Sequence, residues 1–207
     1  YHFGRLVSTG RIRALPVIVD SPMAASVTQI FEKYPELLDP DVARAVRAGR
    51  APFEFPGLRF VRTPQESEGI SKTGGSAVII AGSGMATGGR IKRHLVNNIG
   101  RPESTVLFVG YQAKGTLGRQ IVDGVKPVRI LGAMHPVRAR IERMDAFSAH
   151  ADRDGLLGWV EGLKPRPRQV FLVHGEEQAA ASFASLLRQQ NGWDISTPSY
   201  GDTAAVG

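Results

Sequence analysis

Cysteine is absent from this chain of 207 residues, which excludes disulfide frameworks and thiolate metal sites. The absence fits a reducing compartment, and we expect a cytoplasmic protein. No apolar run approaches the roughly 18 residues of a membrane span, so no membrane partner is expected. The chain starts at Tyr1 without a methionine or a signal-peptide pattern, and we interpret it as part of a longer protein.

Acidic residues are outnumbered by basic ones, which gives a formal net charge of +7. Such a balance favours anionic partners, nucleic acid first, because lysine and arginine neutralise phosphates. A solvated basic surface that binds nothing explains the charge equally well. The hydrophobic share of 42% is ordinary for a globular protein, and the length is sufficient to bury a core.

The first part of the chain alternates short β-branched runs with helical patterns. Strands are expected at residues 16–20, 58–62, 77–81, 105–110 and 128–131, and helices at 25–34, 41–47, 90–97 and 118–123. This alternation, with a glycine-rich turn between a strand and a helix, is typical of a parallel α/β sheet.

The pattern changes in the second part. Residues 137–144 alternate apolar with basic side chains, as a strand exposed on one face does. An amphipathic helix at 152–163, a strand at 169–173 and a helix at 178–190 that ends before Gly192 follow. We therefore expect a soft domain boundary near Lys126, with domains at 1–125 and 126–207.

Ser148, His150 and Asp152 form a polar cluster between an expected strand and an expected helix. An imidazole is suited to proton transfer near neutral pH, and a hydroxyl and a carboxylate stand close by in sequence. The alternative is that Ser148 or Asp152 caps the helix and His150 merely packs nearby.

His174, Gly175 and Glu176 also follow a strand and precede a helix. Loops in this position hold ligands in α/β proteins, so the His174 imidazole is a candidate zinc ligand, and a carboxylate could orient it. The alternative is that His174 only caps a turn, and that Gly175 is there because the backbone geometry of the turn requires glycine. Zinc requires three or four protein ligands, so two histidines cannot complete a site.

Residues 82–89 form a glycine-rich turn between a strand and a helix, where backbone N–H groups could hold a phosphate. Thr87 stands where a dinucleotide-binding turn needs glycine, and the next strand, through Val109, ends without the ribose-binding acid. A Rossmann-like nucleotide-binding protein is therefore disfavoured. Close packing of helix on strand remains an alternative reason for the glycines.

In order along the chain, five segments resemble the β-CASP family of metallo-β-lactamase-fold nucleases, which process RNA. They are residues 17–24 (VIVDSPMA), 81–90 (AGSGMATGGR), 108–112 (FVGYQ), 147–152 (FSAHAD) and 172–176 (LVHGE). The resemblance implies a Rossmann-like parallel β-CASP sheet followed by the C-terminal αβ segment of a metallo-β-lactamase fold.

Individual roles follow from the resemblance. It implies that His150 is the motif B proton donor to the leaving oxygen and that His174 is the motif C ligand of one of two zinc ions. Asp20 corresponds to a residue that marks the fold. The implied phosphate-binding residues are Ser148, Ser83, Gly84 and Met85, and the implied supporting residues are Asp152 and Glu176.

The main zinc motif of the family, His-x-His-x-Asp-His, is absent from the sequence. We therefore expect part of a zinc-dependent ribonuclease that hydrolyses single-stranded RNA and is inactive without an N-terminal metallo-β-lactamase half. Alone, the chain is expected to be poorly stable or to form a homodimer. The alternative function is a non-catalytic RNA-binding or scaffold subunit of the same family.

Overall fold

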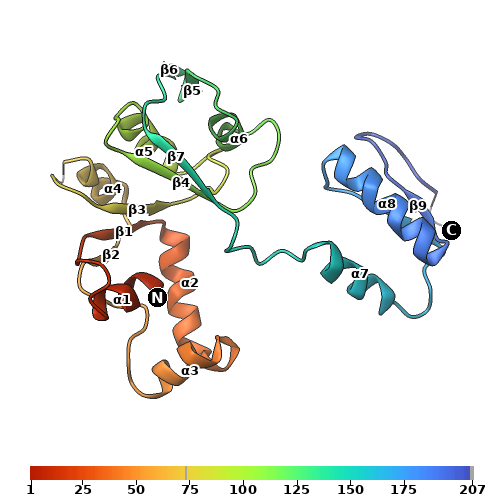
Figure 1. Cartoon of the computed structure of the whole chain (residues 1–207), viewed down its shortest axis with the longest axis horizontal. Coiled ribbons are helices and arrows are strands. Elements are labelled where there is room, and N and C mark those ends of the chain that lie inside the picture. The colour runs from red at the N-terminus through yellow and green to blue at the C-terminus, as the bar shows by residue number, and fades with distance from the viewer. Residues whose placement is uncertain (73, 206–207) are drawn as a thin grey trace. The chain divides into compact units, whose positions relative to one another are not determined.

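The computed structural model describes residues 1–72 and 74–205, which form two compact units, Tyr1–Asp145 and Ala146–Gly207 (Figure 1). The division lies after the sequence-based boundary near Lys126. Val128, Ile130 and Val137 are buried in the core of the first unit, so the chain beyond Lys126 still packs there. The assignment of 1–125 and 126–207 to two family domains stays a prediction.

The first unit contains a parallel sheet in which β1 lies between β2 and β3. These strands span Val17–Asp20, Leu58–Phe60 and Val78–Ala81. Every residue of β1 is buried, as its β-branched sequence predicts for a central parallel strand. Around them lie α1 (His2–Ser8), α2 (Pro22–Lys33), the 3₁₀ helix η1 (Pro35–Leu37), α3 (Pro40–Arg47) and α4 (Pro64–Ile70).

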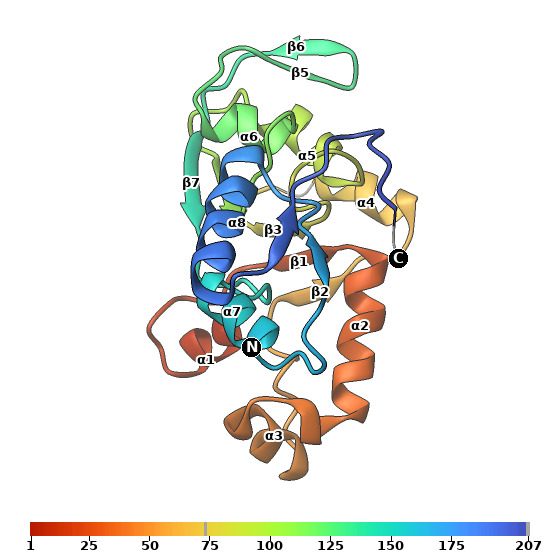
Figure 2. The ribbon, with the colours of Figure 1, turned by 90° about the vertical axis from the view of Figure 1, so that its right-hand side faces the viewer.

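Helix α2 starts directly after β1. Ser21 Oγ accepts a hydrogen bond from Ala24 N at 3.2 Å, and Pro22 occupies the first turn, where its missing N–H is no loss. Both views show α2 running away from the end of β1, with α3 at its far end (Figures 1 and 2).

A second parallel pair in the same unit joins β4 (Thr105–Val109) to β7 (Arg140–Met144), beside an antiparallel hairpin of β5 (Val128–Ile130) and β6 (Ala133–His135). Helices α5 (Ile91–Asn98) and α6 (Leu117–Val122) contribute Leu95 and Ile121 to its core. Val137 and Ala139 are buried while Arg138 and Arg140 are exposed, so the expected alternation is present over residues 137–140. The strand itself begins only at Arg140, and its exposure does not alternate, so the prediction of one alternating strand over 137–144 is correct only in part.

The second unit consists of α7 (Arg153–Glu161), β8 (Gln169–Phe171), α8 (Glu177–Asn191) and β9 (Asp194–Ser196), with β8 and β9 parallel. Its small core contains Val160, Ala184, Leu187 and Ile195. Gly192 ends α8 in the left-handed conformation at φ 59°, which glycine adopts at little cost. The expected α/β architecture with parallel sheets is confirmed.

Candidate functional site

The glycine-rich turn between β3 and α5 is folded around Ser83. Its Oγ accepts a hydrogen bond from Gly88 N at 3.2 Å and lies 3.2 Å from Thr87 Oγ1. Gly89 has a φ of +75°, and a Cβ at that position would lie 2.5 Å from the Gly82 carbonyl oxygen. Only glycine therefore closes this turn in the observed conformation.

Two backbone donors of the turn are available to a ligand. Within residues 1–72 and 74–205, the N–H groups of Gly84 and Met85 form no hydrogen bond. Gly84 is exposed and Met85 is half-buried. Consecutive unpaired N–H groups in a turn before a helix form a concave site for an anion, which is the arrangement that a phosphate requires.

The buried side chain of Gln112 holds this turn from the loop after β4. Its Nε2 donates to the carbonyl oxygens of Gly84 and Tyr111, each at 3.1 Å. Gly118 N, at the start of α6, donates to the Met85 carbonyl oxygen at 3.0 Å. A Cβ at position 118 would overlap with Gln112 Oε1, so α6 approaches this closely only because residue 118 is glycine.

On the other side of the turn, the carboxylate of Asp20 lies fully buried at the end of β1. Its Oδ2 accepts a hydrogen bond from Ser67 Oγ at 2.5 Å and lies 2.6 Å from His94 Nε2. Its Oδ1 lies 2.6 Å from Arg90 Nη1. Arg90 follows Gly89 directly, so this ion pair fixes the end of the turn to the end of β1.

Arg90 also extends this network to the chain after β2. Its Nη1 donates to the Val61 carbonyl oxygen at 3.2 Å, and its Nη2 donates to that of Arg62 at 2.8 Å. One guanidinium therefore joins the carboxyl ends of β1 and β2 to the turn that follows β3. Sheets of this kind place ligands at the carboxyl ends of their strands.

Burial alone would raise the pKa of Asp20, but the hydrogen bonds from Ser67, His94 and Arg90 outweigh it and lower the pKa below its usual value of 3.8. The charged carboxylate therefore stabilises the fold above about pH 3.8 and loses this contribution as pH falls toward its folded pKa. We expect Asp20→Asn to cost about 3 kcal/mol at pH 7, because it leaves Arg90 without its buried counter-charge.

The difference in unfolding free energy between the wild type and Asp20→Asn should narrow as pH falls below 3.8, which urea unfolding at pH 7, 5 and 3 would measure. Asp41→Asn is the matched control, because Asp41 pairs with Arg44 on an exposed helix face and such pairs contribute little. A constant difference across this pH range would contradict the assignment of the effect to the Asp20 charge.

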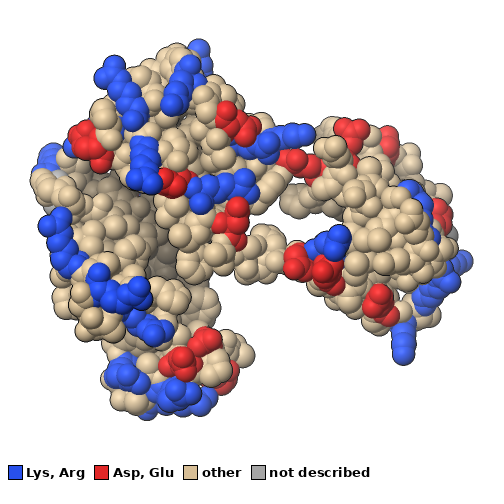
Figure 3. Space-filling view, viewed as in Figure 1, with Lys and Arg blue, Asp and Glu red and all other residues tan. Residues whose placement is uncertain are grey.

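The net positive charge of the chain lies on the first unit. Tyr1–Asp145 contains 21 lysines and arginines against 12 acids, a net charge of +9, whereas Ala146–Gly207 contains 5 against 7, a net charge of −2. The face drawn in Figure 3 shows basic side chains spread over the first unit. Electrostatic attraction for a polyanion is therefore concentrated on the unit that contains the glycine-rich turn.

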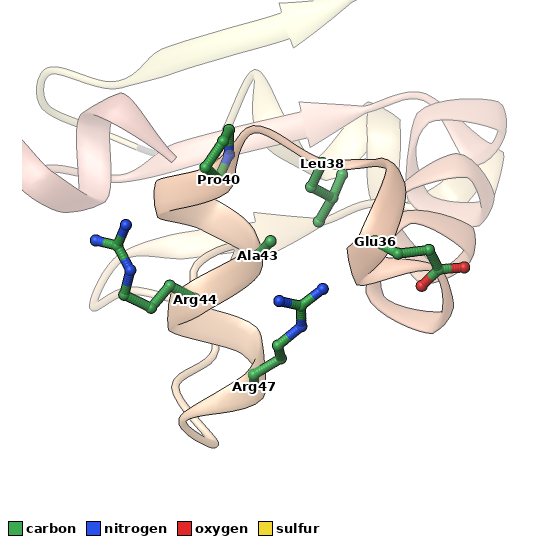
Figure 4. Close-up of a pocket in the computed structure, with 6 residues that line it drawn as sticks. All are labelled: Glu36, Leu38, Pro40, Ala43, Arg44 and Arg47. Carbon is green, nitrogen blue, oxygen red and sulfur yellow. The ribbon is translucent and has the colours of Figure 1, made fainter.

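A pocket lies between η1 and α3, and none of the predicted site residues lines it (Figure 4). Its lining residues are Glu36, Leu38, Pro40, Ala43, Arg44 and Arg47. Arg44 is already paired with Asp41 at 3.2 Å. The negative charge of Glu36, which also lines the pocket, would repel an anion. This pocket is therefore a poorer candidate for anion binding than the turn.

In the second unit, the Ser148–His150–Asp152 cluster lies exposed before α7. Asp152 Oδ1 accepts from Gly155 N at 2.8 Å and caps α7, while Ser148 Oγ accepts from His150 N at 3.2 Å. The capping alternative is thus realised by Asp152. The imidazole of His150 makes no hydrogen bond to any residue in the described part of the chain.

His174 lies in the exposed loop between β8 and α8 with a φ of +64°. A non-glycine residue rarely adopts this left-handed conformation, and such residues are concentrated at functional sites. Glu176 is the N-cap residue of α8, two positions further on. The loop therefore presents the His174 imidazole at the carboxyl end of a strand.

Across residues 1–72 and 74–205, no three histidine, aspartate or glutamate side chains come together as a metal site. The described residues therefore do not fit a complete zinc centre, although His174 could supply one ligand. The predicted residues Ser83, Gly84 and Met85 belong to the first unit, and Ser148, His150, Asp152, His174 and Glu176 belong to the second. None of the helices in the described ranges is long and apolar enough to cross a bilayer.

Comparison with known protein families finds two matches. Residues 1–121 match the Beta-Casp domain, and residues 134–198 match the Zn-dependent metallo-hydrolase RNA specificity domain. Ribonuclease TTHA0252 of Thermus thermophilus is 36% identical over 196 residues, which cover 95% of this chain and 44% of that protein.

Transcription termination factor FttA of Thermococcus kodakarensis is 32% identical over 190 residues, covering 89% of this chain and 29% of the factor. The corresponding factor of Methanosarcina mazei is 33% identical over 185 residues, covering 86% and 29%. The chain thus spans less than half the length of these relatives. Since the Beta-Casp match covers more than half of the chain and the second match continues it, the chain belongs to the metallo-β-lactamase/β-CASP family of RNA nucleases.

Proposed function

We propose that this chain is part of a zinc-dependent ribonuclease that hydrolyses phosphodiester bonds in single-stranded RNA. The observation that supports this most is the presentation of His150 and His174 on exposed loops within the segment that matches the RNA specificity domain. The relative from Thermus thermophilus is named a ribonuclease, and it aligns with 95% of this chain.

In this proposal His150 protonates the leaving oxygen. Imidazole exchanges protons near neutral pH, and an exposed ring that forms no hydrogen bond within residues 1–72 and 74–205 can approach a substrate. Ser148 holds the backbone of the loop through His150 N, and its own hydroxyl proton could be donated to a phosphate oxygen. Asp152 supports the loop by fixing the start of α7.

His174 is proposed as a zinc ligand, with Glu176 supporting its loop. When bound, two zinc ions would supply hydroxide near neutral pH and neutralise the charge of the scissile phosphate. The other ligands would come from a part of the full-length protein outside this chain. Trp159 and Val173 are 67% and 69% exposed, and such a part could cover this apolar surface of the second unit.

RNA phosphates are proposed to bind at Ser83, Gly84 and Met85. The free N–H groups of Gly84 and Met85 would donate to the phosphate oxygens, and the Ser83 hydroxyl lies in the same turn. Because backbone donors recognise the phosphate and not the base, binding here would depend little on sequence.

Zinc content and RNA cleavage of the full-length protein test this proposal, with the 207-residue chain measured in parallel. We expect the full-length protein to bind two zinc ions and to cut single-stranded RNA, and we expect a chelator to abolish cleavage. His174→Ala should lower both zinc content and cleavage, and the 207-residue chain should not cut RNA.

His135→Ala is the matched control, because His135 lies on β6 in the first unit and should retain full zinc content. Salt-sensitive RNA binding without bound metal or cleavage would favour the alternative, a non-catalytic RNA-binding or scaffold subunit.

A further inference from the structure

Tyr111 is an exposed aromatic residue in a loop of fixed conformation. It follows Gly110, which has a φ of +83° directly after β4, and the residue is 52% exposed. The next residue, Gln112, is only 2% exposed. An exposed ring next to a buried polar anchor combines a large apolar surface with little conformational freedom, and this favours recognition of a flat ligand.

The loop that contains Tyr111 is directly attached to the phosphate-binding turn. The carbonyl oxygens of Tyr111 and Gly84 both lie 3.1 Å from Gln112 Nε2, so they are no more than twice that distance apart. Nε2 also donates to the Gly110 carbonyl oxygen at 3.4 Å. Three oxygen partners around one nitrogen define the orientation of the amide, because the other end of the group cannot donate.

We propose that Tyr111 stacks on the nucleobase next to the phosphate held at Ser83–Met85, forming a base-binding subsite beside that turn. The proposal rests on the proposed function, namely that the turn binds an RNA phosphate. In a nucleotide, one sugar separates the phosphate from the base, so an exposed tyrosine on the loop that Gln112 joins to this turn is a candidate to meet a base. Every base has a π-face, so the subsite would accept all four bases.

The chemistry of the first unit favours a nucleic acid over an apolar protein segment at this position. The unit that bears Tyr111 carries a net charge of +9, which attracts a polyanion. Stacking on an aromatic ring then adds affinity that does not depend on salt or on base identity.

The binding of a single-stranded RNA oligonucleotide to the full-length protein tests the inference, in a His150→Ala background so that the RNA stays intact. We expect Tyr111→Ala to raise Kd about 5- to 100-fold and Tyr111→Phe to leave it within about 2-fold. Tyr34→Ala is the matched control, because Tyr34 is 51% exposed at the end of α2, and its Kd should be unchanged.

Oligonucleotides that lack one base identify stacking directly. The difference in Kd between the wild type and Tyr111→Ala should disappear when the base is removed at one position of the RNA, and only at that position. A Kd unchanged by Tyr111→Ala, or an equal loss on every abasic RNA, would overturn the inference.

Neutral methylphosphonate linkages, introduced one at a time, separate this inference from the proposed function. If one such linkage weakens binding to the wild type while Tyr111→Ala has no effect, the phosphate site stands and the stacking site is wrong. If the wild type binds no RNA, or if no single linkage matters, the proposed function fails and the inference fails with it.

Discussion

Replacing His150 with alanine in the full-length protein is expected to lower the rate of RNA cleavage by about 100- to 10,000-fold, the usual contribution of a general acid. The leaving oxygen would then depart without a proton from the protein, so the loss should fall on kcat and not on KM. Zinc content should not change, because His150 is not the proposed ligand. Single-turnover cleavage with metal analysis of the same sample measures both quantities.

The structure predicts that His150→Ala leaves the fold intact. The side chain is exposed, and the two hydrogen bonds that organise its loop use the backbone N–H of His150 and the carboxylate of Asp152. His135→Ala controls for loss of an imidazole elsewhere and should retain full activity. Wild-type cleavage by His150→Ala would exclude His150 as the proton donor, and loss of zinc would point to a ligand role.

Replacing Gly118 with alanine is expected to destabilise the first unit by about 4 kcal/mol. The added methyl group would overlap with Gln112 Oε1 and would lie 3.0 Å from the Met85 carbonyl oxygen. Displacing the buried Gln112 amide removes its hydrogen bonds to the Gly84 and Tyr111 carbonyl oxygens, and a buried group left unpaired costs about 1–3 kcal/mol. Chemical denaturation measures the change.

A double-mutant cycle tests whether the contact with Gln112 causes the loss of stability in Gly118→Ala. Gln112→Ala removes the group that the new methyl would strike, so Gly118→Ala should cost much less in that background than in the wild type. Gly69→Ala is the control, since a Cβ at position 69 in α4 meets no atom within 4 Å and should be neutral or slightly stabilising. If the changes in unfolding free energy caused by the two substitutions simply add, the contact between residues 112 and 118 does not explain the loss of stability.

The strands of the first sheet were predictable because local sequence determines them. β1 is a run of β-branched residues, and β3 (VIIA) and β4 (TVLFV) are also rich in β-branched and other apolar residues. Helix α4 was not predicted, because its sequence PQESEGI shows no apolar periodicity. Its signal was the capping box, in which Thr63 Oγ1 accepts from Glu66 N at 3.2 Å and Glu66 Oε2 accepts from Thr63 N at 3.3 Å. Helix α1 and strands β6 and β9 were also missed, each too short for a periodic pattern.

The polar network around the glycine-rich turn could not be predicted, because its partners lie far apart in the chain. Asp20 was noted as a residue that marks the fold, but Ser67 and His94 follow it by 47 and 74 positions. The one available sign was a carboxylate at the end of a wholly apolar strand, which must have a partner when buried. The roles assigned to His150 and His174 stay predictions, since no group of three potential metal ligands comes together in the described part of the chain.

The separation of charge between the two units has a kinetic consequence. An approaching polyanion attracts one unit, at +9, and weakly repels the other, at −2. Under the proposed function, the field of an RNA would favour first contact with the basic unit, so fewer collisions would be unproductive. Capture by the first unit would thus precede delivery to the histidine loops of the second, and salt would slow the encounter more than it alters the later chemistry.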